Sequence, residues 1–115
     1  MEALSDESID LIVTSPPYPM IGMWDEQFFR WDGEIEKMLK KPPEPAPSSF
    51  RGGDAWERMH SCLDRVWREC DRVLKPSCFI CINIGDPVRT LHGRFRLYPN
   101  HARIIQTFES LGYDN

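Results

Sequence analysis

Two short and almost uninterrupted apolar runs dominate the hydropathy pattern of the chain. They cover residues 9–14 (IDLIVT) and residues 78–84 (CFICINI). A strand that is covered on both faces reads as a continuous apolar run, whereas a half-exposed strand alternates apolar and polar positions. Both runs therefore predict buried strands of a parallel sheet.

A long amphipathic helix is predicted between the two runs. Apolar residues recur at spacings of three and four at Trp56, Met59, Leu63, Val66, Cys70 and Val73. This period places them on one helix face, which we expect to form core. Asp54, followed three residues later by Glu57, is typical of a capping box, and Pro76 marks the end of the helix.

Two further helices complete the pattern. Residues 34–41 favour a short helix, and residues 101–111 favour another, with Asn100 as its N-terminal cap and Gly112 as its stop. The alternation of strands and helices predicts an α/β fold with parallel strands and right-handed crossovers. Because two strands are too few for such a sheet, we expect residues 1–115 to be an incomplete fragment of a larger domain.

Residues 42–53 (PPEPAPSSFRGG) interrupt this pattern with four prolines and two glycines. This composition predicts an extended, flexible loop at about residues 40–53. In the aromatic-rich stretch before it, we expect Trp24, Phe28 and Trp31 to pack beneath the loop, with the lining of a binding-site entrance as the alternative.

Composition and cysteine usage narrow the class of protein. The 115 residues, of which 41% are hydrophobic, suffice for one small domain. No apolar run approaches the ~20 residues that span a bilayer, and no secretory signal is recognisable, so we expect a cytoplasmic protein without a membrane segment. We interpret the four cysteines as small buried apolar residues and expect no metal site, because Cys78 and Cys81 lie three apart on a predicted strand and point to opposite faces.

The net charge of −4 is unevenly distributed. Residues 51–103 carry ten basic and six acidic side chains, whereas residues 1–50 carry four basic and ten acidic ones. Arg89, Arg94 and Arg96 fall in one predicted loop. Clustered arginines are typical of phosphate contacts even in an acidic protein, and an ordinary solvated loop is the alternative.

The first strand ends in the sequence Ser15-Pro16-Pro17-Tyr18. Proline cannot donate a hydrogen bond to a neighbouring strand, and each proline restricts the residue before it. The strand must therefore stop there, and the following corner is stiff. Such a corner holds a hydroxyl, a carbonyl oxygen and an aromatic ring in fixed positions, although the motif taken alone also fits a rigid turn.

Residues 10–18 (DLIVTSPPY) resemble the catalytic motif of the amino-group DNA methyltransferases, which methylate exocyclic amines of DNA bases with S-adenosylmethionine. Residues 72–76 (RVLKP) and 83–86 (NIGD) are similar to the helix end and the strand end that follow the catalytic loop in this family. The resemblance implies a Rossmann-like class I methyltransferase domain, of which this chain holds the catalytic-motif part. Serine as the first motif residue resembles the cytosine-N4 branch, and adenine-N6 methylation stays open.

The resemblance also implies roles for single residues. The Ser15 hydroxyl and the Pro16 carbonyl would accept hydrogen bonds from the target amine, and Pro17 keeps the corner stiff. Tyr18 would stack on a base that is flipped out of the duplex. Asp86 and the three arginines would contact the DNA substrate, with an ordinary loop-start aspartate as the alternative for Asp86.

The family's cofactor loop, an aromatic-x-Gly-x-Gly stretch after a strand, has no counterpart in the sequence. No cofactor-binding residue is therefore predicted, and the resemblance implies S-adenosylmethionine only for the complete enzyme. The implied partners are double-stranded DNA and the remainder of the domain, in a restriction–modification system of bacterial, archaeal or phage origin. We expect the fragment alone to be inactive, and its uncovered strand edges allow self-association. The alternative of another class is a non-catalytic DNA- or partner-binding module derived from a methyltransferase.

Overall fold

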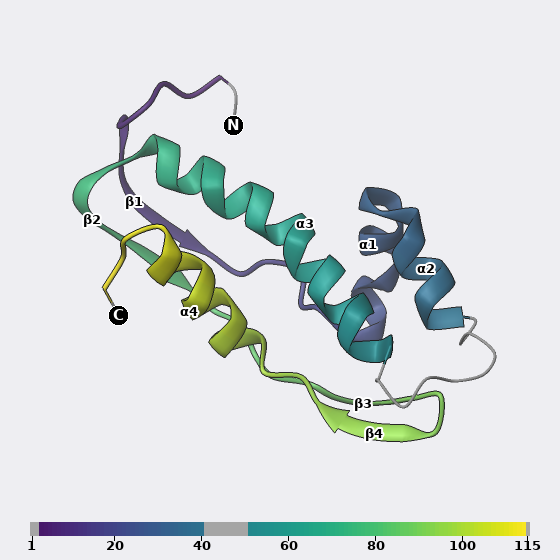
Figure 1. Cartoon of the computed structure of the whole chain (residues 1–115). Coiled ribbons are helices and arrows are strands. Elements are labelled where there is room, and N and C mark those ends of the chain that lie inside the picture. Colours follow the sequence, from purple (N-terminus) through teal and green to yellow (C-terminus); the bar gives the residue numbers. More distant parts are fainter. Residues whose placement is uncertain (1–2, 41–50, 115) are drawn as a thin grey trace.

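The structure, a computed structural model, describes residues 3–40 and 51–114. Strands β1 (Ile9–Thr14) and β2 (Leu74–Ile82) pair in parallel, as the sequence predicts, and the described residues between them form three α-helices (Figure 1). The Asn83 N–H donates to the Thr14 carbonyl at 2.9 Å, so the pairing continues just beyond the end of β2. The carboxyl ends of the two strands are thereby held side by side.

Helices cover one face of this sheet. The rings of Trp67 and Phe108, which join helix α3 (Arg51–Val73) to helix α4 (Asn100–Ser110), lie 5.6 Å apart between their centroids. On the opposite face, Val13 and Phe79 are 72% and 75% exposed. The prediction of strands buried on both faces is therefore wrong for the described residues, because every helix that packs on this sheet lies on the same side.

Helix α3 confirms the amphipathic pattern but begins earlier than predicted. It starts at Arg51, so Asp54 lies inside the helix and the predicted cap at Asp54 is wrong. Val66 is 39% exposed, and Trp67, at 1%, takes its place in the core. Trp56 is half-buried and packs against the core, and the remaining positions of the pattern are buried: Met59, Leu63, Cys70 and Val73.

Strand β2 begins at Leu74, directly after α3, and not at residue 78. The register runs from Ile9 opposite Leu74 to Leu11 opposite Phe79, so three extra residues of β2 form an irregular bulge. The bulge contains Pro76, which a regular central strand would not accept, and Ser77, whose φ is +62°. Pro76 therefore lies within the strand and not simply beyond the helix.

A β-hairpin replaces the predicted basic loop. Strands β3 (Val88–Leu91) and β4 (Arg94–Leu97) pair antiparallel and project away from the sheet (Figure 1). The two residues between them, His92 and Gly93, have φ values of +51° and +80°. Positive φ at both central residues is the geometry of the two-residue turn whose twist matches a hairpin.

Helices α1 and α2 lie beside the N-terminal turns of α3, and α4 runs alongside α3 (Figure 1). The 3-10 turn η1 (Gly22–Trp24) leads into α1 (Asp25–Trp31) and then into α2 (Gly33–Lys40), which confirms the predicted short helix. Pro99, not Asn100, occupies the cap position of α4. Gly112, with φ of +96°, ends α4 as predicted.

The predicted flexible loop at residues 40–53 lies mostly outside the described part of the chain and stays a prediction. Lys40 and residues 51–53 are helical, and residues 41–50 lie outside the described part of the chain. No helix in the described part is long and apolar enough to cross a membrane.

Candidate active site

The double-proline corner follows β1 at the carboxyl edge of the sheet. Pro16 is buried, Pro17 and Tyr18 are half-buried, and Ser15 is exposed. In parallel α/β sheets ligands bind at the carboxyl ends of the strands. The exposed serine therefore lies where a substrate can reach it, beside the segment that leaves β2.

The Tyr18 ring lies against the backbone of Gly85. A Cβ atom added to Gly85 would stand 3.3 Å from Cε2 and 3.9 Å from Cδ2 of Tyr18. Gly85 does not have a positive φ, so glycine is favoured here by the close approach of the ring and not by the backbone conformation. The contact joins two motifs, residues 15–18 and 83–86, that the sequence indicates separately.

The chain after the corner is anchored to α3. The Tyr18 carbonyl accepts a hydrogen bond from the Ile21 N–H at 3.2 Å, which closes a tight turn. Met20, in the left-handed region at φ +68°, buries its side chain and directs its N–H to the Met59 sulfur at 3.4 Å. This turn keeps Tyr18 from moving independently of the core.

Asn100 connects this turn to the exit of β2. Its side chain is fully buried, and its amide nitrogen donates to the carbonyls of Pro19 at 3.0 Å and Gly85 at 3.1 Å. Its amide oxygen lies 2.8 Å from Trp56 Nε1 and 2.9 Å from His60 Nε2. The predicted capping role of Asn100 is therefore wrong, and no local sequence signal distinguishes a cap from this long-range role.

Asp86 caps α4 from outside the helix. Its Oδ1 accepts the His101 N–H at 3.0 Å, and its Oδ2 lies 2.5 Å from His101 Nδ1. A carboxylate near a helix N-terminus satisfies free N–H groups and interacts favourably with the helix dipole. Asp86 therefore contacts the first turn of α4, and its predicted contact with DNA stays a prediction.

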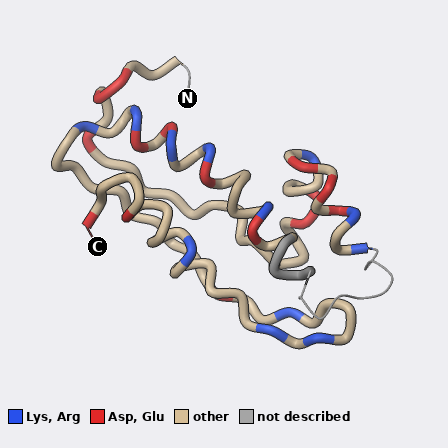
Figure 2. Tube along the Cα trace, viewed as in Figure 1, with Lys and Arg blue, Asp and Glu red and all other residues tan. Residues whose placement is uncertain are grey.

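The three predicted arginines lie on the two strands of the hairpin (Figure 2). The strand register, with Arg89 opposite Arg96 and Arg94 two residues before Arg96, places all three on one face. Arg89 pairs with Asp25 through two hydrogen bonds of 2.9 and 2.8 Å, and this pairing raises the pKa of Arg89. Arg96 places its guanidinium 5.3 Å from the Tyr98 ring centroid, and Arg94 is exposed at the turn. Arg89 therefore links the hairpin to α1, and its positive charge is paired with the Asp25 carboxylate.

The predicted aromatic group serves packing at two of its three positions. Phe28 is fully buried, and Trp24 packs against the core. Trp31 is 42% exposed and meets Phe28 edge-on, with centroids 5.5 Å apart. None of these contacts involves the double-proline corner.

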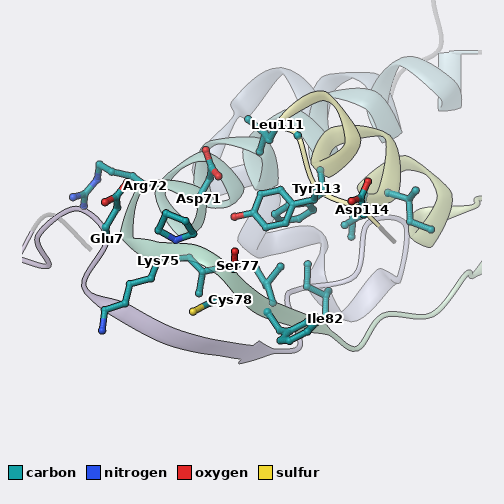
Figure 3. A pocket seen from close by; sticks show the side chains of 18 of the residues that line it. Glu7, Asp71, Arg72, Lys75, Ser77, Cys78, Ile82, Leu111, Tyr113 and Asp114 are labelled. Carbon is teal, nitrogen blue, oxygen red and sulfur yellow. The ribbon is translucent and has the colours of Figure 1, made fainter.

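The structure also contains a groove of about 1090 Å³ between β2 and α4 (Figure 3). Ile82, Phe108 and Tyr113 are among its lining residues, and residues 15–18 are not. Burial, assisted by the Asp71 carboxylate, raises the pKa of Tyr113 to about 12. This groove is therefore separate from the double-proline corner.

The cysteines divide into two groups. Cys62 and Cys70 are 5% exposed and confirm the interpretation as buried apolar residues. Cys78 is half-buried and Cys81 is exposed on the open face of the sheet, so the interpretation is wrong for these two. Among the residues that the structure describes, no group of three His, Cys, Asp or Glu side chains is placed to hold a metal ion.

Two known proteins are similar to this chain in sequence. The chain is 44% identical over 116 residues to the type II methyltransferase M.MjaI of Methanocaldococcus jannaschii, with 98% of the chain and 38% of that protein covered. It is 42% identical over 113 residues to the type II methyltransferase M.MthZI of Methanothermobacter thermautotrophicus, with 98% of the chain and 30% of that protein covered. The chain thus spans about a third of the length of these relatives.

A solved structure has the same fold. The crystal structure of a Thermus thermophilus protein assigned as a DNA modification methylase superposes with a TM-score of 0.62 at 30% identity, over 99% of this chain and 36% of that one. The family model for DNA methylases of the N6/N4 type matches residues 9–114. The chain therefore belongs to the N6/N4 DNA methylase family.

Proposed function

We propose that the chain is the catalytic-motif part of an S-adenosylmethionine-dependent DNA methyltransferase that methylates the N4 amine of cytosine in duplex DNA. One observation carries the proposal: an exposed Ser15 and a Tyr18 ring that lies against Gly85 both belong to the corner at the carboxyl ends of two parallel strands. The names of the archaeal relatives support a prokaryotic restriction–modification system. Because prokaryotic DNA lies in the cytoplasm, we expect the enzyme there too.

The chemistry requires an acceptor rather than a strong base. The lone pair of the cytosine amine is delocalised into the ring, so the amine is a weak nucleophile. Oxygen acceptors that face its N–H groups, here the Ser15 hydroxyl and the Pro16 carbonyl, localise that lone pair and stabilise the positive charge that develops on the nitrogen. Because the reaction is a direct displacement, alignment of the amine is the main contribution of the corner.

Tyr18 supplies the second requirement, which is a place for the extruded base. Flipping a base out of the duplex costs a few kcal/mol, which contacts in the pocket must offset. A ring that is fixed by Gly85 and by the following turn loses little freedom when a base stacks on it.

S-adenosylmethionine supplies an activated methyl group when bound. This chain has no Gly-x-Gly loop after a strand, so we assign cofactor binding to the remainder of the enzyme. The isolated chain is accordingly expected to transfer no methyl group.

The test is methyl transfer by the complete enzyme, with mass spectrometry of the nucleosides. We expect N4-methylcytosine from the wild type and at least a tenfold lower kcat for Ser15→Ala and for Tyr18→Ala, with cofactor affinity within about twofold. Ser77→Ala, an exposed serine in the β2 bulge, is the matched control.

The alternatives give different products. N6-methyladenine would assign the enzyme to the adenine branch while leaving the roles of the corner unchanged. DNA binding without any methylated nucleoside would instead favour the non-catalytic module.

A further inference from the structure

We propose that Asn100 is a positioning residue for methyl transfer, which holds the Tyr18 ring in register with the exit of β2. The inference rests on the proposed function and extends it to a residue outside both motifs. Asn100 does not belong to the corner and acts through the two segments that enclose the Tyr18 ring.

The geometry of the amide carries the inference. Its two N–H groups bind the carbonyl of Pro19, the residue directly after Tyr18, and the carbonyl of Gly85, on which the Tyr18 ring lies. One side chain thus fixes both the backbone that bears the ring and the backbone that supports it. These partners lie 81 and 15 residues away from Asn100 in the sequence.

The donors and acceptors allow a single arrangement. Backbone carbonyls only accept and an indole N–H only donates, so the amide nitrogen must face Pro19 and Gly85 and the amide oxygen must face Trp56. The same oxygen is 2.9 Å from His60 Nε2, so His60 must carry its proton there. All four hydrogen-bonding positions of the amide are therefore occupied.

The state of His60 is consistent with this arrangement. The side chain is fully buried, and burial lowers its pKa to about 4, so the ring is neutral at pH 7 and carries one proton. Its Nδ1 atom has no hydrogen-bond partner among the described residues, which leaves Nε2 as the protonated position. Helix α3 thereby holds the amide through two rigid rings, those of Trp56 and His60.

Substitution of Asn100 should act through Tyr18. In the complete enzyme we expect Asn100→Ala to lower kcat about tenfold or more, with cofactor affinity within about twofold. In a Tyr18→Ala background the same substitution should lower kcat less than about threefold, because the ring that Asn100 positions is already absent. Gln106→Ala, which removes an exposed amide from the same helix, should leave kcat unchanged.

A second variant covers the case in which Asn100→Ala does not fold. Trp56→Phe removes one donor to the amide oxygen and keeps an aromatic ring. We expect a smaller fall in kcat, about threefold to tenfold, that again disappears in the Tyr18→Ala background.

The outcomes separate this inference from the proposed function. The inference alone would be overturned if the wild-type enzyme methylates DNA but the Asn100 and Trp56 variants leave kcat unchanged. It would also be overturned if these variants lower kcat by the same factor whether Tyr18 is present or replaced by alanine. A wild-type enzyme that produces no methylated nucleoside would overturn the proposed function and the inference with it. Nitrogen NMR of the complete enzyme, a readout that does not depend on activity, should show the His60 proton on Nε2, and a proton on Nδ1 would also contradict the inference.

Discussion

The contact between Gly85 and the Tyr18 ring is tight enough for one methyl group to disturb it. In Gly85→Ala the new Cβ would lie 3.3 Å from Cε2 of Tyr18. Carbon atoms prefer separations of about 3.5–4.0 Å, so the ring must retreat by a few tenths of an ångström. Gly85 is not among the glycines with positive φ, so alanine introduces no backbone strain.

A small displacement should affect turnover much more than stability. Tyr18 is half-buried and its ring can retreat, so we expect the free energy of unfolding to change by less than about 1 kcal/mol. Misplacement of a reacting group by 1 Å can cost about a hundredfold in rate, so a few tenths should lower kcat about five- to tenfold.

Steady-state methylation by the complete enzyme and urea unfolding measure the two effects. Gly33→Ala is the matched control, because nothing lies within 4 Å of a Cβ at Gly33. A Gly85→Ala enzyme whose kcat stays within twofold of the wild type would refute the idea that the position of the Tyr18 ring limits the reaction. A loss of several kcal/mol in the free energy of unfolding would instead show that the Tyr18 ring cannot retreat from the added methyl group.

Two further predictions concern the support of the site. Arg103 pairs with Asp64 at 2.8 Å, and both side chains are largely buried between α3 and α4, at 14% and 12% exposed. Arg103→Ala leaves that carboxylate without its main partner, and we expect urea unfolding to show a loss of about 3 kcal/mol, whereas an unchanged midpoint would contradict it. Burial lowers the pKa of His60 from 6.5 to about 4, so the unfolded chain binds its proton first as the pH falls. The stability that neutral His60 contributes is therefore fully present above about pH 6.5 and is lost towards pH 4, by about 3 kcal/mol. Urea unfolding at several pH values should show that the free energy of unfolding depends less steeply on pH in His60→Gln than in the wild type. The same pH dependence in both proteins would contradict the lowered pKa of His60.

The elements that sequence predicts correctly are those with local causes. The first strand and the corner follow from an apolar run that meets two prolines, Pro16 and Pro17. Helix α3 follows from the period of its apolar residues, and the end of α4 from Gly112. Each of these signals acts within a few residues of the feature that it determines.

The features that sequence misses depend on distant partners. The hairpin forms around His92, a non-glycine residue with positive φ, between strands whose arginines suggest a solvated loop. The partners of Asn100 are 15 to 81 residues away, so its position before a helix suggests only a cap. The apolar runs predict burial on both faces, yet Val13 and Phe79 are exposed in a chain that spans about a third of its relatives.

Photocrosslinking tests the central claim most directly, because it asks which residue touches the extruded base. The complete enzyme is irradiated with duplex DNA that carries 5-iodocytosine at the position identified by product analysis, and the crosslinked peptide is mapped by mass spectrometry. We expect a crosslink at Tyr18 that is lost in Tyr18→Ala. Efficient crosslinking elsewhere, with none in residues 15–18, would contradict it.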